Sequence, residues 1–140
     1  MTPDEIEKEV MRRRKQEWLL EALVQPESVF RDERGTIVNI LNKPIGAIAL
    51  IYCHANTVRS NHFHKENWHY LYVISGRMLY RERLEDGAEM TRVLSAGEMI
   101  FTPPNRPHRT EFIIDTVLLS LGNTSKDHES HEADLVRIEW

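Results

Sequence analysis

From residue 25 onward, the sequence is a succession of short β-branched and aromatic runs separated by turn residues about every ten positions. Turn pairs such as Arg34-Gly35 and Ser75-Gly76 separate runs such as AIALIYCH and RMLYRER. No helical apolar pattern interrupts the series. This pattern predicts about seven to nine strands in a sandwich or small barrel, and it excludes an alternating βαβ architecture.

One long helix is expected before this β-rich part, over residues 2–23. Thr2, Pro3 and Glu5 form a capping box with proline at the first helical position. The apolar stripe of this helix consists of Ile6, Val10, Trp18, Leu19 and Ala22. The basic run Arg12–Lys15 lies on the other faces, and we interpret it as a solvated surface without a function of its own.

Length and charge limit the classes of protein to be considered. A chain of 140 residues with 41% hydrophobic content fills one core, so we expect an N-terminal helix (residues 1–24) followed by one β-domain (residues 25–140). The net charge of −4 without a dominant basic face argues against a nucleic-acid partner. A single cysteine, Cys53, and the lack of a signal peptide or a long apolar run indicate a cytoplasmic protein without a membrane partner. A small-molecule substrate is the expected partner.

The histidines are unevenly placed, and three of them lie close together in the sequence. His62 and His64 are two residues apart, so in an extended strand both side chains point to the same face. His69 follows after a loop long enough to reverse the chain, which allows its strand to lie antiparallel to the first. Cross-strand neighbours on one face have Cβ atoms roughly 4.5–5.5 Å apart, so the three imidazoles can converge on one ion.

His108 is the fourth candidate ligand. It lies in FTPPNRPHRTEF, where Pro103, Pro104 and Pro107 restrict the backbone and hold the loop rigid. Each histidine alone can be a hydrogen-bonded structural residue. Four neutral imidazoles that face one apolar interior would each need a hydrogen-bond partner of their own. Together they therefore favour a bound metal.

Two motifs around these histidines resemble those of the cupin superfamily. The spacing of the first motif is carried by His62, His64, His69 and Gly76. The spacing of the second is carried by Gly97, Pro103 and His108. The resemblance covers roughly residues 28–124 and implies an all-β double-stranded β-helix, the jelly-roll barrel of cupins. The chain departs from the usual Gly, Glu, Gly and Asn of the motifs at Asn56, His69, Asn105 and Phe112.

The ligand set predicts a divalent transition metal, Zn, Mn, Fe or Ni, held by His62, His64, His69 and His108. Four neutral ligands leave the charge of the ion uncompensated and favour a Lewis acid. The candidate acid or base residues, chosen by residue type, are Tyr80, Glu111 and Tyr52. Arg59 and Arg109 are the candidates to bind an anionic group of the substrate.

A second, weaker resemblance concerns cupins of surface-polysaccharide and nucleotide-sugar pathways, in stretches such as FRDERGTIVNIL and NHFHKENWHYLYVISGRM. It implies an isomerase or epimerase that acts on a sugar or another polyhydroxy carbonyl compound. The same four histidines also fit a metal-dependent dioxygenase of a chelating small molecule, or a cupin that binds a small molecule without turnover. The helix stripe and a possible C-terminal edge strand predict a homodimer.

Overall fold

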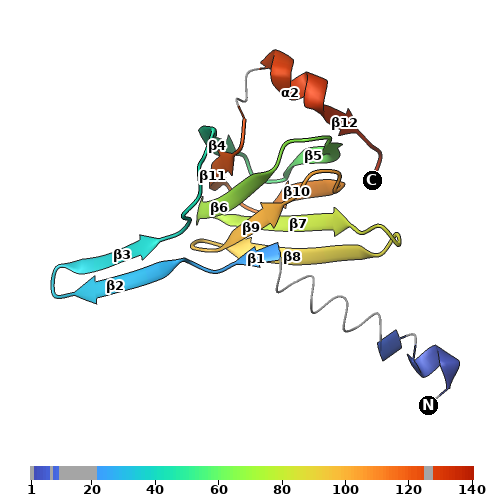
Figure 1. The fold of residues 1–140 in the computed structure, drawn as a ribbon, viewed down its shortest axis with the longest axis horizontal. Helices are drawn as coiled ribbons and strands as arrows, with labels where there is room; N and C mark the ends of the chain where they lie inside the picture. The colour runs from blue at the N-terminus through green and yellow to red at the C-terminus, as the bar shows by residue number, and fades with distance from the viewer. Residues whose placement is uncertain (1, 7, 10–21, 125–127) are drawn as a thin grey trace.

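The computed structural model describes residues 2–6, 8–9, 22–124 and 128–140. Within these ranges the chain forms two five-stranded antiparallel sheets and one separate hairpin (Figure 1). The first sheet contains, in spatial order, β1 (Leu23–Val24), β9 (Met99–Thr102), β6 (His69–Ser75), β11 (Thr116–Gly122) and β4 (Ala47–Cys53). The second contains β12 (Leu135–Arg137), β5 (Thr57–His64), β10 (His108–Phe112), β7 (Arg77–Arg83) and β8 (Glu89–Ser95). The predicted all-β antiparallel architecture is confirmed.

One apolar core lies between the two sheets. Both sheets contribute to it; its buried members include Leu71, Val73, Met78, Tyr80, Leu94, Ile100, Phe112 and Leu118. Met78 and Tyr80 alternate with arginines on β7 and are fully buried, so both side chains point into this core. On β6, Leu71 and Val73 continue the face that begins with His69.

Strand β6 is buried on both faces, because a second apolar cluster covers its outer side. Tyr70, Met99 and Leu121 form the buried part of this cluster. The chain that enters β4 packs on them through Ile40, Leu41 and Ile45. Burial on both faces explains why the sequence HYLYVIS is nearly continuously apolar after its histidine.

A β-bulge interrupts β5 between its two ends. His62 pairs with His108 and Ser60 pairs with Arg109, so Asn61 is the additional residue of β5. Ser60 and Asn61 have positive φ angles of 74° and 54°, a backbone region that residues other than glycine seldom adopt. Beyond the bulge the alternation of faces is reversed. Arg59 and His62 lie on opposite sides of the bulge and are three positions apart in the sequence, yet both therefore lie on the inner face of the sheet.

At the N-terminus, the predicted capping box is present. The Thr2 amide donates to a Glu5 carboxylate oxygen (2.8 Å), and the Glu5 amide donates to the Thr2 hydroxyl (3.2 Å). Residues 3–6, 8–9 and 22 are helical. Val10, Trp18 and Leu19 of the predicted stripe, and the basic run Arg12–Lys15, lie outside the described residues. In the part of the chain that is described, no helix is long and apolar enough to cross a membrane.

The C-terminal part contains one element that the sequence reading missed. A short helix, α2 (His128–Asp134), precedes the last strand, although the sequence alone leads us to expect only an edge strand there. The strand expected around Leu135 and Val136 is present as β12, which pairs with β5 at the edge of the second sheet. In Figure 1, α2 and β12 lie together beside the end of β5 that carries the histidines.

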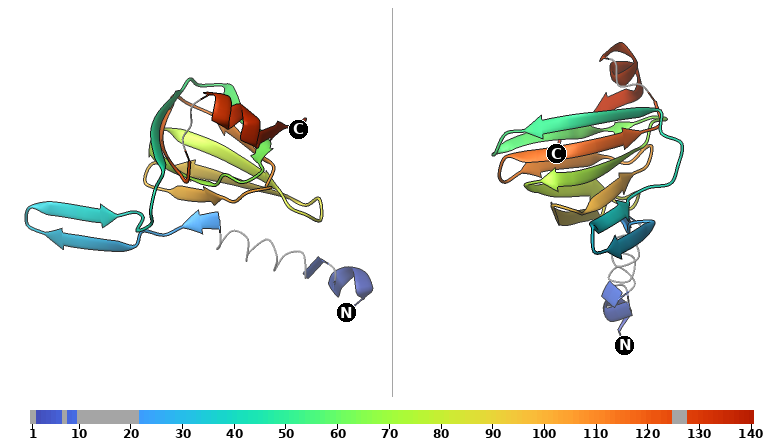
Figure 2. Two further views of the ribbon diagram at one scale, coloured as in Figure 1. Left: turned by 45° about the horizontal axis from the view of Figure 1, so that its top comes forward. Right: turned by 90° about the vertical axis from the view of Figure 1, so that its left-hand side faces the viewer.

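Strands β2 (Ser28–Asp32) and β3 (Gly35–Asn39) form a hairpin that projects away from the two sheets (Figures 1 and 2). The predicted turn is present at its tip, one residue earlier than expected: Glu33 and Arg34 form it, and Gly35 pairs with Asp32 as the first residue of β3. The Asp32 carboxylate accepts hydrogen bonds from the amide and the guanidinium of Arg34 and so closes the turn. The apolar side chains Val29, Phe30, Ile37 and Val38 of this hairpin are exposed to solvent.

Candidate metal centre

Four imidazoles from three strands converge inside the barrel. His62 and His64 come from β5, His69 from β6 and His108 from β10. The ring centroids of His62 lie 4.8 Å from His64 and 4.9 Å from His108. His69 lies 5.4 Å from His64 and 5.5 Å from His108. His64, His69 and His108 are buried, and His62 is half-buried.

Three of the four rings form a closer group. One ring nitrogen from each of His62, His64 and His108 lies within 4.8 Å of the others, a spacing at which a single cation can contact all three. His69 is outside this group of three, although its ring borders it. The described donor set therefore consists of imidazole nitrogens, a ligand type that suits Zn, Fe and Ni.

Two of the rings are oriented by hydrogen bonds on Nδ1. His64 Nδ1 lies 3.1 Å from Oδ2 of Asp134, and His108 Nδ1 lies 2.9 Å from the backbone oxygen of Arg106. Because a carboxylate and a carbonyl only accept, Nδ1 carries the proton in the neutral form of either ring. Nε2 then holds the lone pair that a metal ligand needs.

A cavity of about 170 Å³ opens next to the imidazoles. Its polar wall consists of Arg59, Ser60, His62, His64, His69 and Thr110. Its apolar wall consists of Ile51, Leu71, Phe112 and Leu118. Arg59 is exposed, and it pairs with the buried Thr110 of β10. The bulge in β5 therefore places Arg59 on the same face of the sheet as the histidines.

Behind His108 lies a buried polar network that does not reach the cavity wall. The Tyr80 hydroxyl donates to Glu82 Oε1 (2.7 Å) and lies 2.7 Å from the Thr102 hydroxyl, while the Arg106 guanidinium donates to Glu82 Oε2 (3.0 Å). The Tyr80 ring stacks against His108 at 6.2 Å. Burial, followed by the negative charge of Glu82, raises the pKa of Tyr80 well above its ordinary value. Tyr80 is therefore a neutral structural donor.

The family model for the cupin domain matches residues 51–121, half of the chain, and these residues contain all four histidines of the cluster. This chain belongs to the cupin family. A comparison with curated protein sequences gave no match.

Solved structures share the cupin fold at low sequence identity. QdtA, a sugar 3,4-ketoisomerase from Thermoanaerobacterium thermosaccharolyticum in complex with TDP, is 21% identical, with 83% of this chain and 86% of that chain covered and a TM-score of 0.68. The TDP-quinovose 3,4-ketoisomerase WlaRB from Campylobacter jejuni is 20% identical over 82% of this chain and 90% of that chain, with a TM-score of 0.69. The dTDP-4-dehydrorhamnose 3,5-epimerase from Sulfolobus tokodaii is 16% identical over 82% and 78% of the two chains, with a TM-score of 0.64.

Besides Tyr80, three of the candidate residues chosen by type lie away from the cavity of this cupin. Arg109 and Glu111 alternate on β10 with the buried His108 and Thr110, so they lie on the outer face of the sheet, where Arg109 donates to Glu111 (2.8 Å). Tyr52 is 68% exposed on the outer side of β4. The structure therefore brings Arg59, His62, His64 and His69 to the cavity wall and leaves these three side chains outside it.

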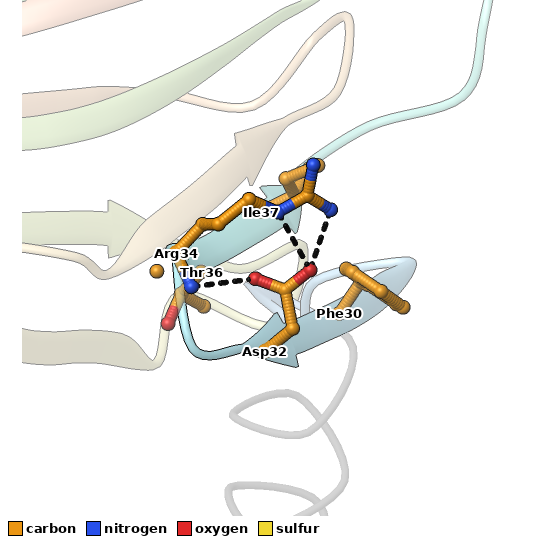
Figure 3. Close-up of a pocket in the computed structure, with 6 residues that line it drawn as sticks. Phe30, Asp32, Arg34, Thr36 and Ile37 are labelled. Carbon is orange, nitrogen blue, oxygen red and sulfur yellow. Dashed lines mark hydrogen bonds and ion pairs between the residues drawn. The ribbon is translucent and has the colours of Figure 1, made fainter.

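A larger hollow of about 270 Å³ lies on the projecting hairpin (Figure 3). It is lined by Phe30, Asp32, Arg34, Gly35, Thr36 and Ile37. Arg34 and Asp32 pair with each other there, and the Arg34 side chain lowers the pKa of Asp32 from its ordinary value. This hollow is an open depression without a histidine, so the smaller cavity beside the imidazoles is the candidate site of the cupin.

Two supporting residues of the site were missed by the sequence reading. Asp134 lies in a polar, charged segment before the last strand, and its distance from His64 in the sequence hides their contact. Glu82 shares the inner face of β7 with Met78 and Tyr80, so the period-two alternation of this strand could have identified a buried carboxylate.

Proposed function

We propose that this cupin is a metal-dependent isomerase or epimerase that acts on a sugar or another small polyhydroxy carbonyl compound. The observation that carries the proposal is the close group of His62, His64 and His108 at a small cavity, with two of the rings oriented through Nδ1. The likeness to two sugar ketoisomerases and an epimerase supports the substrate class.

His62, His64 and His108 would hold the ion, Zn, Mn, Fe or Ni, through ring nitrogens. A divalent ion at this position supplies Lewis acidity that polarises a carbonyl or hydroxyl oxygen of the substrate. The protein orients two of these ligands with one carboxylate and one backbone carbonyl, and such outer partners raise ligand basicity and fix the tautomer.

His69 is the group that would move the proton next to the carbonyl. It lines the cavity, it lies outside the close group of three, and the described cavity wall contains no carboxylate or tyrosine. Imidazole titrates near neutral pH and is the most frequent general base in enzymes. The alternative, His69 as a fourth ligand of the ion, predicts a loss of bound metal when this residue is replaced.

The cavity admits only the reacting part of a substrate. Its volume of about 170 Å³ is below the ~300–1,000 Å³ of typical ligand pockets. The rest of the substrate would therefore extend past the rim, where the exposed Arg59 offers a guanidinium to an anionic group. Thr110 and Ser60 supply hydroxyl groups on the same wall.

Solvent deuterium incorporation tests this function. The metal-loaded protein is incubated in D2O with a panel of keto sugars and nucleotide-linked keto sugars, and deuterium at the carbon next to the carbonyl is measured by mass spectrometry. Incorporation that needs both protein and added metal supports the proposal. Binding of these sugars without exchange, under every metal tested, would show a binding protein instead of an enzyme.

A dioxygenase remains the second candidate, favoured by the all-imidazole donor set that also suits Fe. Oxygen uptake by the Fe(II)-loaded protein with a chelating diketone distinguishes the two reactions. An isomerase turns over without oxygen, whereas a dioxygenase stops in an anaerobic chamber.

We also propose that the protein forms a homodimer. Among the described residues, the β2–β3 hairpin belongs to no larger sheet, and β4 pairs only with β11. Apolar side chains are exposed on the outer side of β4 at Ile48, Leu50 and Tyr52. An isolated hairpin is only marginally stable in water, and an open apolar edge favours pairing. The hairpin of one copy laid on β4 of a second copy would cover both surfaces, and a two-fold axis repeats the contact.

A further inference from the structure

Asp134 connects the C-terminal segment to the centre of the barrel. It is the last residue of α2, and its carboxylate uses both oxygens: Oδ2 lies 3.1 Å from His64 Nδ1, and Oδ1 accepts the Glu66 amide at 3.0 Å. Its backbone oxygen accepts the Lys65 amide at 2.9 Å. The side chains of His64 and Asp134 are 5% and 11% exposed, so little water competes for this contact.

Strand β12 then covers the outer edge of the strand that carries two of the histidines. Leu135 pairs with His64 and Arg137 pairs with His62. The Ile138 amide continues the pairing with a hydrogen bond of 2.9 Å to the carbonyl of Asn61 in the bulge. Without β12, the part of β5 that carries His62 and His64 would be an edge strand, whose backbone groups on that side would be open to water.

We propose that Asp134 is a positioning residue for His64, and that the C-terminal segment of residues 128–140 is a structural part of the metal centre. The inference rests on the proposed metal site and deepens it. Metal binding and docking of this segment would reinforce each other, because any coupling between two binding events acts equally in both directions.

The physical basis is the proton on the His64 ring. A carboxylate that accepts from Nδ1 holds the tautomer in which Nε2 carries the lone pair, and it increases the basicity of that nitrogen. Removal of such an outer partner typically lowers metal affinity by about 10–100-fold.

Asp134→Asn is the sharpest variant, because it keeps the shape of the side chain. One oxygen of Asp134 faces an amide N–H of Glu66 and the other faces His64 Nδ1. Asparagine must place its NH2 group at one of these positions. If the NH2 group faces His64, the ring must accept at Nδ1 and carry its proton on Nε2. If it faces Glu66, two donors oppose each other and the segment is loosened.

Glu132→Gln is the matched control. Glu132 lies in the same helix, and its carboxylate pairs with Arg137 at 2.7 Å on the surface of the segment. The control therefore removes one acidic charge from α2 and leaves the contact with His64 in place. Thermal unfolding of both variants, compared with the wild-type protein, checks that they fold.

The experiment measures Zn²⁺ affinity by competition with a chromophoric chelator and the His64 tautomer by long-range ¹H–¹⁵N NMR of the metal-free protein. The expected result for Asp134→Asn is an affinity about 10–100-fold lower, together with either loss of the Nδ1–H tautomer or a loosened C-terminal segment, while Glu132→Gln stays near the wild type. Equal affinity of Asp134→Asn and wild type, or equal losses in both variants, would overturn the proposal.

Hydrogen exchange supplies the reciprocal measurement. Zn²⁺ is expected to slow exchange of the Ile138 and Lys65 amides, which join the C-terminal segment to β5, and to do so much less in Asp134→Asn. Unchanged exchange of these amides in the Zn²⁺-loaded wild type would contradict the coupling. If the wild-type protein binds no divalent ion, the proposed function fails; the metal-free tautomer measurement then still decides whether Asp134 orients His64.

Discussion

His62 of β5 and His108 of β10 are direct partners in the antiparallel ladder, and their ring centroids lie 4.9 Å apart. Their pairing joins the two cupin motifs, which are far apart in the sequence. His62 directly follows the bulge in the sequence, and Arg59, on the other side of the bulge, faces the same interior. One local irregularity in β5 therefore places a candidate metal ligand and a candidate anion-binding residue on one side of the sheet.

Replacement of one histidine of the close group is expected to abolish most metal binding. His62→Ala removes a ring nitrogen that lies within 4.8 Å of those of His64 and His108. The loss should exceed the 10–100-fold that removal of an outer partner typically causes. Elemental analysis of the dialysed proteins measures the bound ion. His54→Ala, at an exposed position outside the cluster, is the control and should retain the wild-type content.

Metal binding is expected to weaken as the pH falls through roughly 6 to 5. A ligand imidazole must be neutral, and its reference pKa is about 6.5, so protons compete with the ion below that value. Affinity should therefore be constant at pH 7 to 8 and decline steeply on acidification. A competition titration at several pH values checks this. Metal content that stays constant down to pH 4 would contradict histidine ligation.

How much of this site the sequence predicts depends on how local each feature is. The spacing of His62 and His64 and the following turn are local, so period-two alternation anticipates that their rings meet. The same alternation applied to β10 would have placed Glu111 outside, because it follows the inward Thr110 by one residue. Selection by residue type alone ignored that alternation.

Features that depend on distant contacts were beyond the sequence pattern. The bulge at Asn61 is one additional residue in a strand, and it lies where β5 pairs with β10 on one side and accepts the Ile138 amide on the other. The contact of Asp134 with His64 joins residues 70 positions apart. A polar, charged tail resembles a solvated end of the chain until tertiary structure brings it to β5.

Tyr80→Phe is expected to lower stability and to leave the reaction nearly unchanged. The variant removes the hydroxyl that bonds Glu82 and Thr102 in a fully buried network, and an unsatisfied buried partner costs about 1–3 kcal/mol. Urea unfolding measures the free energy, and deuterium exchange of substrate measures the reaction. A loss of turnover beyond tenfold, without a change in the fold, would instead restore Tyr80 as a catalytic candidate.

The raised pKa of Tyr80 gives a second prediction, at alkaline pH. Burial favours the neutral phenol in the folded state, so above about pH 10 the unfolded chain releases this proton before the folded chain does. The free energy of unfolding should therefore fall as the pH rises through 10. The fall should be smaller in Tyr80→Phe. Equal alkaline slopes for the two proteins would show that the phenol is not held neutral by its surroundings.

Arg59→Ala is expected to raise KM for an anionic substrate with little effect on kcat. Charge-assisted hydrogen bonds contribute about 1.5–3 kcal/mol to binding. The low end of this range applies because Arg59 is exposed, and it corresponds to a roughly tenfold increase in KM. Steady-state kinetics with a charged substrate and its neutral analogue separate the two cases. Arg109→Ala, on the outer face and paired with Glu111, is the control and should behave as the wild type.

Charged substitutions on the hairpin are expected to convert a dimer to a monomer. Phe30 and Ile37 are direct partners across β2 and β3, and they are 54% and 59% exposed. Phe30→Glu combined with Ile37→Lys places an opposite-charge pair at this position. The pair supports the hairpin but disfavours apolar contact with a second copy. Sedimentation velocity over a concentration series gives the mass of both proteins. A wild-type chain that sediments as a monomer at every concentration contradicts the proposed homodimer. A double variant that remains dimeric assigns the interface to a surface other than the hairpin.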